Sequence, residues 1–481
     1  MEHPQNFKQP LPSSSINTDE TLNRNMGIWN SFTLGFAVVS PVVGLYAIVG
    51  VQGQVTGGGW FAALIICLTM QLFVATVYAE LASQFPIAGG AYKWAHLLCG
   101  RITGQYAGAI YVSSTIAMLT TTAYTGGIWL AILFGLNSES GIAMVGWGIA
   151  FLLLCLAINL APVKFFKGII AMGVYAEIVG SFGMALLLFL FFRELPISEL
   201  FQHLGTGTAP NQLSAFLAAL AIAGWAFIGF DACSTTSEET HQPKHSVPRA
   251  VFLSLLAVGT VVVFNSAALT LSVDHEVLSK TSSTFDPITP LISTHIGAWA
   301  EKHFLLIVII AFLACGASVV KYTSRIVFSM AREGILPSQL SIVSHHGTPH
   351  HAILATVVLA SMGLMLGLSD EAVATIISFG TGGLYAMFAT TTGVALFSRL
   401  TGRWNPALGE LKLGIWGLII NSIAFLWSVF ELINIAWPRS YMAAPDAPWW
   451  QLWAVPLVLA GILVLTTLVI LIKGEKHGTQ S

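Results

Sequence analysis

Charged side chains are scarce in this chain. Lysine, arginine, aspartate and glutamate together make up 9% of the 481 residues, whereas 55% are apolar. This composition excludes an ordinary soluble protein of two or three domains. The apolar residues gather in runs of about 20, the length of a helix that crosses a bilayer. The sequence therefore predicts an all-α polytopic membrane protein that is embedded in the lipid bilayer. The net charge of −2 gives no sign of a nucleic-acid partner.

Cysteine is also rare, with five residues in the whole chain. Cys67, Cys155 and Cys315 lie inside apolar runs, and none of the five has the spacing of metal ligands. We therefore expect no disulfide framework, no zinc site and no other bound metal or cofactor. The polar residues inside the apolar runs include no nucleophile–base pair, which argues against an enzyme. A channel is a further alternative, but it would need a ring of polar groups, usually supplied by an oligomer.

The hydrophobic runs predict about twelve transmembrane helices. Lysine and arginine concentrate in both tails and in alternate loops, and the opposite loops hold only Arg193, Lys280, Lys302 and Arg439. By the positive-inside rule, both termini are expected in the cytoplasm. The expected spans are 28–50, 60–83, 105–134, 143–159, 169–192, 214–237, 250–273, 304–330, 353–368, 372–397, 413–433 and 452–472.

Polar interruptions occur in two spans that stand five spans apart. In the sixth span, residues 224–240 place Gly229 and Asp231 at membrane depth, before a hydroxyl-rich turn. A carboxylate there costs a few kcal/mol or more and indicates a functional site, although helix capping is the simpler alternative. In the first span, Pro41 interrupts the helix between Ser40 and Gly44. Paired broken helices are the sequence signature of inverted repeats around a central substrate site, whereas a proline kink alone would explain only the first span.

Four motifs carry a family resemblance. After the second span, residues 86–92 read Pro-Ile-Ala-Gly-Gly-Ala-Tyr. The sixth span contains Ile-Gly-Phe-Asp-Ala at 228–232, followed by Ser-Glu-Glu-Thr at 237–240. Pro-Arg-Ala at 248–250 begins the seventh span, and residues 324–337 end the eighth. Together these motifs resemble the amino acid–polyamine–organocation transporter superfamily, and the wording in the sixth span is most similar to its amino acid/choline branch.

The resemblance implies a LeuT-type fold with two inverted repeats of five helices and two peripheral helices. We accordingly expect a cytoplasmic disordered tail (1–27), a first repeat (28–192), an extracytoplasmic loop (193–213), a second repeat (214–397), two further helices (398–472) and a cytoplasmic tail (473–481). It also implies alternating access to a small amine-bearing substrate. One departure concerns the first helix, where many relatives hold the substrate carboxylate on a Gly-x-Gly turn. Here Pro41 offers no amide donor in that region, so a substrate that lacks an α-carboxylate remains an alternative.

The predicted substrate site lies between the two breaks. Amides at the start of the outer half of helix one would face an anionic group, because a helix N-terminus is electropositive. Carbonyls of helix six would accept from an ammonium group, and Asp231 would supply the negative charge. Trp225 is predicted to close the site from outside and to hold a cation by cation–π attraction, with simple packing as the alternative. The candidate residues are Ser40, Val42, Val43, Gly44, Trp225, Ala226, Phe227, Phe230 and Asp231.

A second buried carboxylate, Glu177, lies in span five. The resemblance places it where sodium-independent relatives carry a lysine that imitates a sodium ion. We predict that Glu177 pairs with Lys321 of span eight beneath the broken first helix, either as a structural pair or as a coupling site. Thr323 and Ser324 are expected to take part if the coupling ion is sodium rather than a proton. Glu239, at the end of helix six, is predicted to form an inner gate, with a solvated face as the alternative.

These observations predict a secondary active transporter of the cell membrane, which would be the inner membrane in a bacterium. Its expected substrate is an amino acid or related small amine, moved with a proton or by exchange. Carriers of choline, GABA-like or polyamine cations, and sodium-coupled uptake, remain alternatives. Polyamines fit less well, because a single intramembrane aspartate is little compensation for several positive charges.

Overall fold

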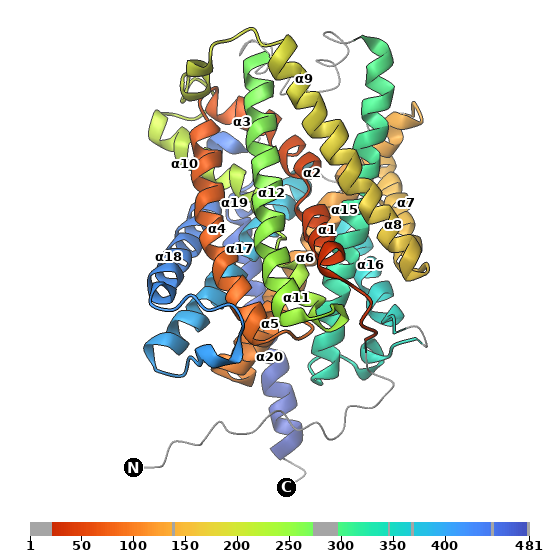
Figure 1. The fold of residues 1–481 in the computed structure, drawn as a ribbon, viewed down its shortest axis with the longest axis vertical. Helices are drawn as coiled ribbons and strands as arrows, with labels where there is room; N and C mark the ends of the chain where they lie inside the picture. The colour runs from red at the N-terminus through yellow and green to blue at the C-terminus, as the bar shows by residue number, and fades with distance from the viewer. Residues whose placement is uncertain are drawn as a thin grey trace.

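The computed structural model describes residues 22–136, 140–272, 297–344, 347–366, 370–443 and 447–478. In these parts the regular structure is helical, apart from isolated bridges between Met26 and Thr240 and between Gly57 and Leu204. The helices form an elongated bundle, and most run along its long axis (Figure 1). The expectation of an all-α chain is thus confirmed for the described residues.

Ten helices in the described residues are long and apolar enough to cross a membrane. They coincide with ten of the twelve expected spans. The ninth expected span corresponds to α16 (His350–Met365), a shorter apolar helix, and the tenth to α17 (Asp370–Leu400). The chain is therefore a multi-pass membrane protein, while the count of twelve and the inverted-repeat relation stay predictions.

The first span is broken where the sequence indicates. Helix α1 (Ile28–Val39) ends before Ser40, and α2 (Pro41–Tyr46) starts with proline, whose missing amide is harmless at a helix start. Ser40 adopts φ 47°, a left-handed conformation that costs a serine of the order of 1 kcal/mol or more. A third helix, α3 (Val49–Thr56), completes the segment. The break is therefore a strained, non-helical joint rather than a smooth proline kink.

The sixth span is broken in the same manner. Helix α10 (Gln212–Ala223) tightens into the 3₁₀ turn η4 (Gly224–Phe227), and helical structure resumes only at α11 (Ala232–Thr235). Gly229, at φ 93°, permits the irregular backbone between them. Both Pro41 and Asp231 are buried. The prediction of two interrupted helices facing the protein interior is thus confirmed.

The fifth span contains an irregularity that the sequence did not indicate. Helix α8 (Val163–Ala176) passes into the π-helical segment η2 (Glu177–Phe182) before α9 (Gly183–Phe191). π-Helical turns are rare and frequently occur at functional sites. This turn begins at the buried Glu177.

The other helices enclose the two broken ones. In the apolar stretch of each membrane-spanning helix, 78% of the residues are buried in α6 and 72% in α15, compared with 6% in α20. Helices α6 and α15 therefore form the centre of the bundle, and α20 is peripheral. Helix α18 packs on α17 and α4. The bounds are α4 Phe61–Gln84, α5 Ala91–Cys99, α6 Arg101–Leu133, α7 Gly141–Leu160, α12 Pro243–Ser272, α15 Ala298–Arg332, α18 Trp416–Ala436, α19 Trp449–Leu452 and α20 Ala454–Gly478. Short 3₁₀ turns occupy η3 Ile197–Phe201, η5 Ser237–Glu239, η6 Ser338–Ser341, η8 Pro406–Leu408 and η9 Ser440–Met442.

The segment before α1 is held against the end of helix six. The amides of Asn25 and Met26 each donate to the carbonyl of Glu239 at 2.9 Å, and His241 N donates to Met26 O at 2.7 Å. Residues 22–27, expected to belong to a disordered tail, are therefore ordered by these bonds. Residues 1–21 of that expected tail, and 479–481 of the other, lie outside the described residues.

Candidate substrate and gating site

The two broken helices touch at their breaks. A Cβ atom added to Gly44 would lie 3.3 Å from Ala226 Cα, so the α2 and η4 backbones approach closely. Trp225 is buried, and its indole Nε1 donates to Val43 O at 3.4 Å. The structure thus brings Val43 and Gly44 beside Trp225 and Ala226, as a shared substrate site requires.

Ser40 organises the first break. Its hydroxyl accepts from Val43 N at 3.1 Å, and its carbonyl accepts from Gly44 N at 2.8 Å. Two of the three amides expected to be free for a substrate are therefore already bonded to Ser40. This corrects the expectation for Val43 and Gly44: capping of α2 by the preceding serine satisfies its first amides. The amide of Val42 is not bonded to Ser40.

Asp231 lies at the second break, where two tyrosines from distant helices reach it. The hydroxyl groups of Tyr111 (α6) and Tyr322 (α15) both donate to Asp231 Oδ2, the latter at 2.7 Å. The other oxygen, Oδ1, is buried and has no hydrogen-bond partner among the described residues. Asp231 thus keeps one acceptor unused at the centre of the bundle, and burial of such an oxygen is costly unless a donor reaches it.

The neighbouring aromatic residues pack rather than line an opening. The Phe230 ring stacks on Phe388 at a centroid distance of 5.3 Å and meets Tyr78 edge-on at 5.7 Å. Phe227 is fully buried. Phe230 therefore fixes the orientation of the loop that carries Asp231, and a direct substrate contact by Phe230 or Phe227 stays a prediction.

Glu177 and Lys321 do not pair with each other. Ser40 Oγ donates to Glu177 Oε1 at 2.6 Å, whereas Lys321 Nζ lies 2.7 Å from Glu239 Oε2. The expected ion pair is thus wrong, because each residue has a nearer polar partner on a broken helix. Glu177 instead joins the π-helical turn of span five directly to the strained joint of helix one.

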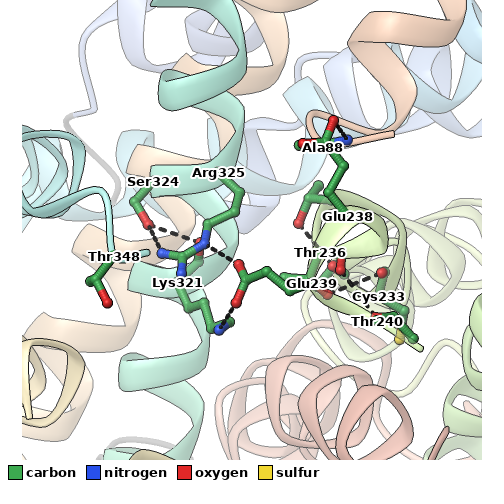
Figure 2. Close-up of polar contacts among 12 residues, drawn as sticks. Ala88, Cys233, Thr236, Glu238, Glu239, Thr240, Lys321, Ser324, Arg325 and Thr348 are labelled. Carbon is green, nitrogen blue, oxygen red and sulfur yellow. Dashed lines mark hydrogen bonds and ion pairs between the residues drawn. The ribbon is translucent and has the colours of Figure 1, made fainter. Parts of the chain in front are cut away.

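Glu239 is the centre of a charge cluster, which we define as the buried residues Glu239, Lys321 and Arg325 and the partly buried residues Glu238 and Arg332. Figure 2 shows Lys321 and Arg325 extending from α15 toward the Glu239 carboxylate. Arg325 Nε lies 2.6 Å from Glu239 Oε1, and the exposed fractions of Glu239, Lys321 and Arg325 are 3%, 6% and 4%. One carboxylate therefore holds two cations away from water.

Glu238 extends the charge cluster to the loop after the second span. Arg332 donates to both of its carboxylate oxygens, at 2.8 and 2.6 Å. Ala88 N donates to Glu238 Oε1 at 3.0 Å (Figure 2). Ser329 Oγ donates to Ala88 O at 2.8 Å. The charge cluster thus connects the end of helix six, the end of α15 and the Gly-Gly loop.

The protonation of Glu239 follows from these contacts. Burial by itself would favour the neutral acid, but Arg325 and Lys321 together lower the pKa of Glu239 to about 2. Glu239 is consequently ionised at every physiological pH. It serves as a permanent anion in this cluster rather than as a proton carrier.

Two further candidates for ion coupling sit apart from Glu177. The Ser324 hydroxyl donates to Lys321 O at 2.9 Å and accepts from Arg325 at 3.2 Å. The Arg325 guanidinium is thus the cation that this hydroxyl meets, and a sodium site at Ser324 stays a prediction. Thr323 Oγ1 is buried, and no described residue forms a hydrogen bond with it.

A small, partly open pocket lies between α1 and α8, beside the charge cluster. Lys321 lines it, but Asp231 does not, so we do not assign the substrate to it. Its lining residues are Met26, Asn30, Thr33, Leu34, Val163, Phe166, Lys167, Ile170 and Lys321.

Sequence reasoning missed Tyr111, Tyr322 and Arg325. The two tyrosines are ordinary aromatic residues in apolar helices, and nothing in their local pattern distinguishes them. Arg325 carried a usable signal, because it stands one helical turn after Lys321 and two cations on one helix face need an anion.

Replacement of Gly229 by alanine tests the irregular backbone of helix six. The added Cβ would lie 2.6 Å from Val38 Cγ1, and alanine tolerates φ 93° poorly. We expect a loss of about 1–3 kcal/mol of stability, measured as faster thermal inactivation in detergent. Gly461→Ala, in α20, is the control, because no atom lies within 4 Å of the added Cβ. Equal inactivation of the two variants would contradict the role assigned to Gly229.

Comparison with known proteins identifies the family. The family model for amino acid permeases matches residues 27–463. The branched-chain amino acid permease BcaP of Bacillus subtilis is 22% identical over 430 residues, which cover 87% of this chain and 90% of the relative. An amino-acid permease of Arabidopsis thaliana is 22% identical and covers 96% and 95%. The choline transporter of Saccharomyces cerevisiae is 22% identical and covers 95% and 82%. These relatives are transporters and not enzymes, as the sequence predicted. The chain belongs to the amino acid permease family of the amino acid–polyamine–organocation superfamily.

Proposed function

We propose that this protein is a secondary active transporter that carries an amino acid by alternating access. The observation that carries the proposal is Asp231, a buried carboxylate at the break of helix six with one oxygen left without a donor. An ammonium group would satisfy that oxygen and neutralise the charge. The Val42 amide and the indole of Trp225 lie beside the adjoining break, where they would meet the rest of the substrate.

The charge cluster supplies the proposed inner gate. It ties the end of helix six to α15 and to the Gly-Gly loop, and the segment before α1 is bonded to the same place. Release of the substrate to that side would require these contacts to separate. We infer that this side faces the cytoplasm, as the positive-inside rule predicts, with both termini there.

Counterflow in proteoliposomes tests the function. Vesicles loaded with one unlabelled compound are given the same compound in labelled form outside, and a carrier then shows saturable, trans-stimulated accumulation. The panel is L-leucine, L-serine, L-glutamate, L-arginine, choline and spermidine. We expect counterflow with an amino acid. Counterflow with choline or spermidine alone would favour an organocation carrier, and leak without trans-stimulation would indicate a channel.

Glu177→Gln tests proton coupling. Glutamine can still accept from Ser40, so the joint of helix one should hold, while the residue can no longer exchange a proton. We expect net uptake driven by a pH gradient to fall about tenfold or more and to lose its dependence on pH, because coupling between two binding sites typically changes affinity by that order. Counterflow at equal pH should persist.

Unchanged uptake and pH dependence in Glu177→Gln would remove Glu177 from the mechanism. Uptake that follows a sodium gradient, and not a pH gradient, in the wild-type protein would instead favour sodium coupling. Exchange without net uptake under either gradient would identify an exchanger.

A further inference from the structure

Another buried carboxylate, Glu431, lies in α18, outside the ten helices that we expect to form the substrate pathway. Its side chain is fully buried, and in the part of the chain that the structure describes Oε1 has no hydrogen-bond partner. The other oxygen accepts from Asn434 Nδ2 at 3.2 Å. A carboxylate at membrane depth with half of its acceptors unused points to a function, because an apolar residue would otherwise be cheaper there.

Glu431 is surrounded by groups from several helices. One helical turn before it, Trp427 Nε1 donates to Gln71 Oε1 of α4 at 3.2 Å, and Gln71 Nε2 is buried without a partner. Cys67 of α4 and Tyr385 of α17 interact electrostatically with Glu431. Arg439, a cation near Glu431, donates to the side-chain oxygen and to the backbone carbonyl of Asn434. Within the described part of the chain, Cys67, Tyr385 and Arg439 are the titratable or charged groups that interact with Glu431.

Two contacts connect this carboxylate to helix six. In the first, Asn434 Nδ2 donates both to Glu431 and to the carbonyl of Leu217 in α10, the latter at 2.9 Å. The same amide group therefore touches the carboxylate and the backbone of the broken helix.

The second contact runs through Tyr385 to the break itself. The Tyr385 hydroxyl lies 3.7 Å from Cys67 Sγ and is within reach of the Trp427 indole. Its ring packs on Gly224, the first residue of η4, since a Cβ there would lie 3.1 Å from Tyr385 Cε2. Tyr385 also meets Phe388, which stacks on Phe230 beside Asp231. A change of charge at Glu431 can thus reach the start of η4 and the loop that follows it, through packed side chains.

We propose that Glu431 is a proton-binding site in the peripheral helix α18 and that its protonation is linked to the conformation of helix six through Asn434 and Tyr385. The proton would bind to Oε1, the oxygen without a donor. When η4 moves during transport, Tyr385 and Leu217 must move with it, and the surroundings of Glu431 change. By linkage, substrate binding and proton binding at Glu431 then alter each other by the same factor, about fivefold or more. The proton site stands independently of the proposed function, whereas the link to substrate rests on it.

The proton site is tested without any substrate by infrared titration of purified protein. The carbonyl band of a protonated carboxyl group is followed across pH in the wild type, Glu431→Gln and the control Glu410→Gln, whose side chain is exposed. We expect Glu431→Gln alone to lose a titrating band equivalent to one carboxyl group. Glu431→Asp, a second variant against misfolding, should keep the band with a displaced midpoint. Identical titrations of wild type and Glu431→Gln would overturn the proposal.

The link to helix six is tested by Tyr385→Phe, which removes the hydroxyl and keeps the ring on Gly224. We expect this variant to keep the Glu431 band and to displace its midpoint. The amino acid with the largest counterflow in the panel should displace the midpoint in the wild type, and less in Tyr385→Phe. A midpoint that moves with neither change would overturn the link. Lack of counterflow with every compound would refute the proposed function. The infrared titration would still decide separately whether Glu431 binds a proton.

Discussion

Glu239→Gln should destabilise the protein by about 3–5 kcal/mol, the usual effect of removing one partner from a buried ion pair. Lys321 and Arg325 would both remain buried, beside a side chain that no longer offsets their charge. Unfolding of a membrane protein is commonly irreversible, so the measurement is the rate of thermal inactivation in detergent at a fixed temperature. The control is Glu410→Gln, which removes an exposed carboxylate. Inactivation of Glu239→Gln at the wild-type rate would contradict the cluster's role.

The same cluster gives a definite pH dependence. The pKa of Glu239 is lowered from 4.5 to about 2 by Arg325 and Lys321, against the effect of burial. A carboxylate with a depressed pKa in the folded state stabilises the fold above its unfolded pKa and loses that effect as the pH falls through the folded value. The difference between wild type and Glu239→Gln should therefore be constant above about pH 5 and shrink below about pH 4. A difference that changes near neutral pH would implicate another group.

Asp231→Asn should abolish transport while leaving the folded protein intact. Loss of a buried charge partner for an ammonium group costs about 2–5 kcal/mol of binding, which is more than about 30-fold in affinity. Without substrate the variant should be at least as stable as the wild type, because a buried carboxylate with an unsatisfied oxygen is replaced by a neutral group of the same shape. Counterflow measures the first effect, and thermal inactivation without substrate measures the second.

The control for Asp231→Asn is Tyr322→Phe, which removes one donor to Asp231 and keeps its charge. We expect Tyr322→Phe to retain counterflow, with a changed half-saturation concentration. Counterflow by Asp231→Asn at the wild-type rate and half-saturation concentration would show that the substrate's ammonium group binds elsewhere.

The breaks in the bundle could be predicted because their causes are local. Pro41 removes an amide, and Gly229 permits a backbone conformation that other residues avoid. The π-helical turn at Glu177 could not be predicted, because no residue in that stretch prevents a regular helix. It coincides with the hydrogen bond to Ser40, a residue 137 positions away in the sequence.

The sequence could not predict which of the buried charged residues pair with one another. The sequence predicted that Lys321 pairs with Glu177, whereas in the structure Lys321 pairs with Glu239. The structure places Glu239 beside Lys321 because the end of helix six, after its break, turns toward α15 (Figure 2). Arg325, one turn further along, then adds a second cation to the same carboxylate.

The amino-acid sequence by itself determined that this protein crosses the membrane many times, where two of its helices break, and that carboxylates lie at membrane depth. These properties depend on the length of apolar runs and on the backbone chemistry of proline and glycine, which are local. Only the tertiary structure decided which donors and cations those carboxylates meet. Tyr111, Tyr322 and Ser40 become partners through the packing of helices that are far apart in the chain, and a buried charge interacts with whatever that packing brings within a few ångströms.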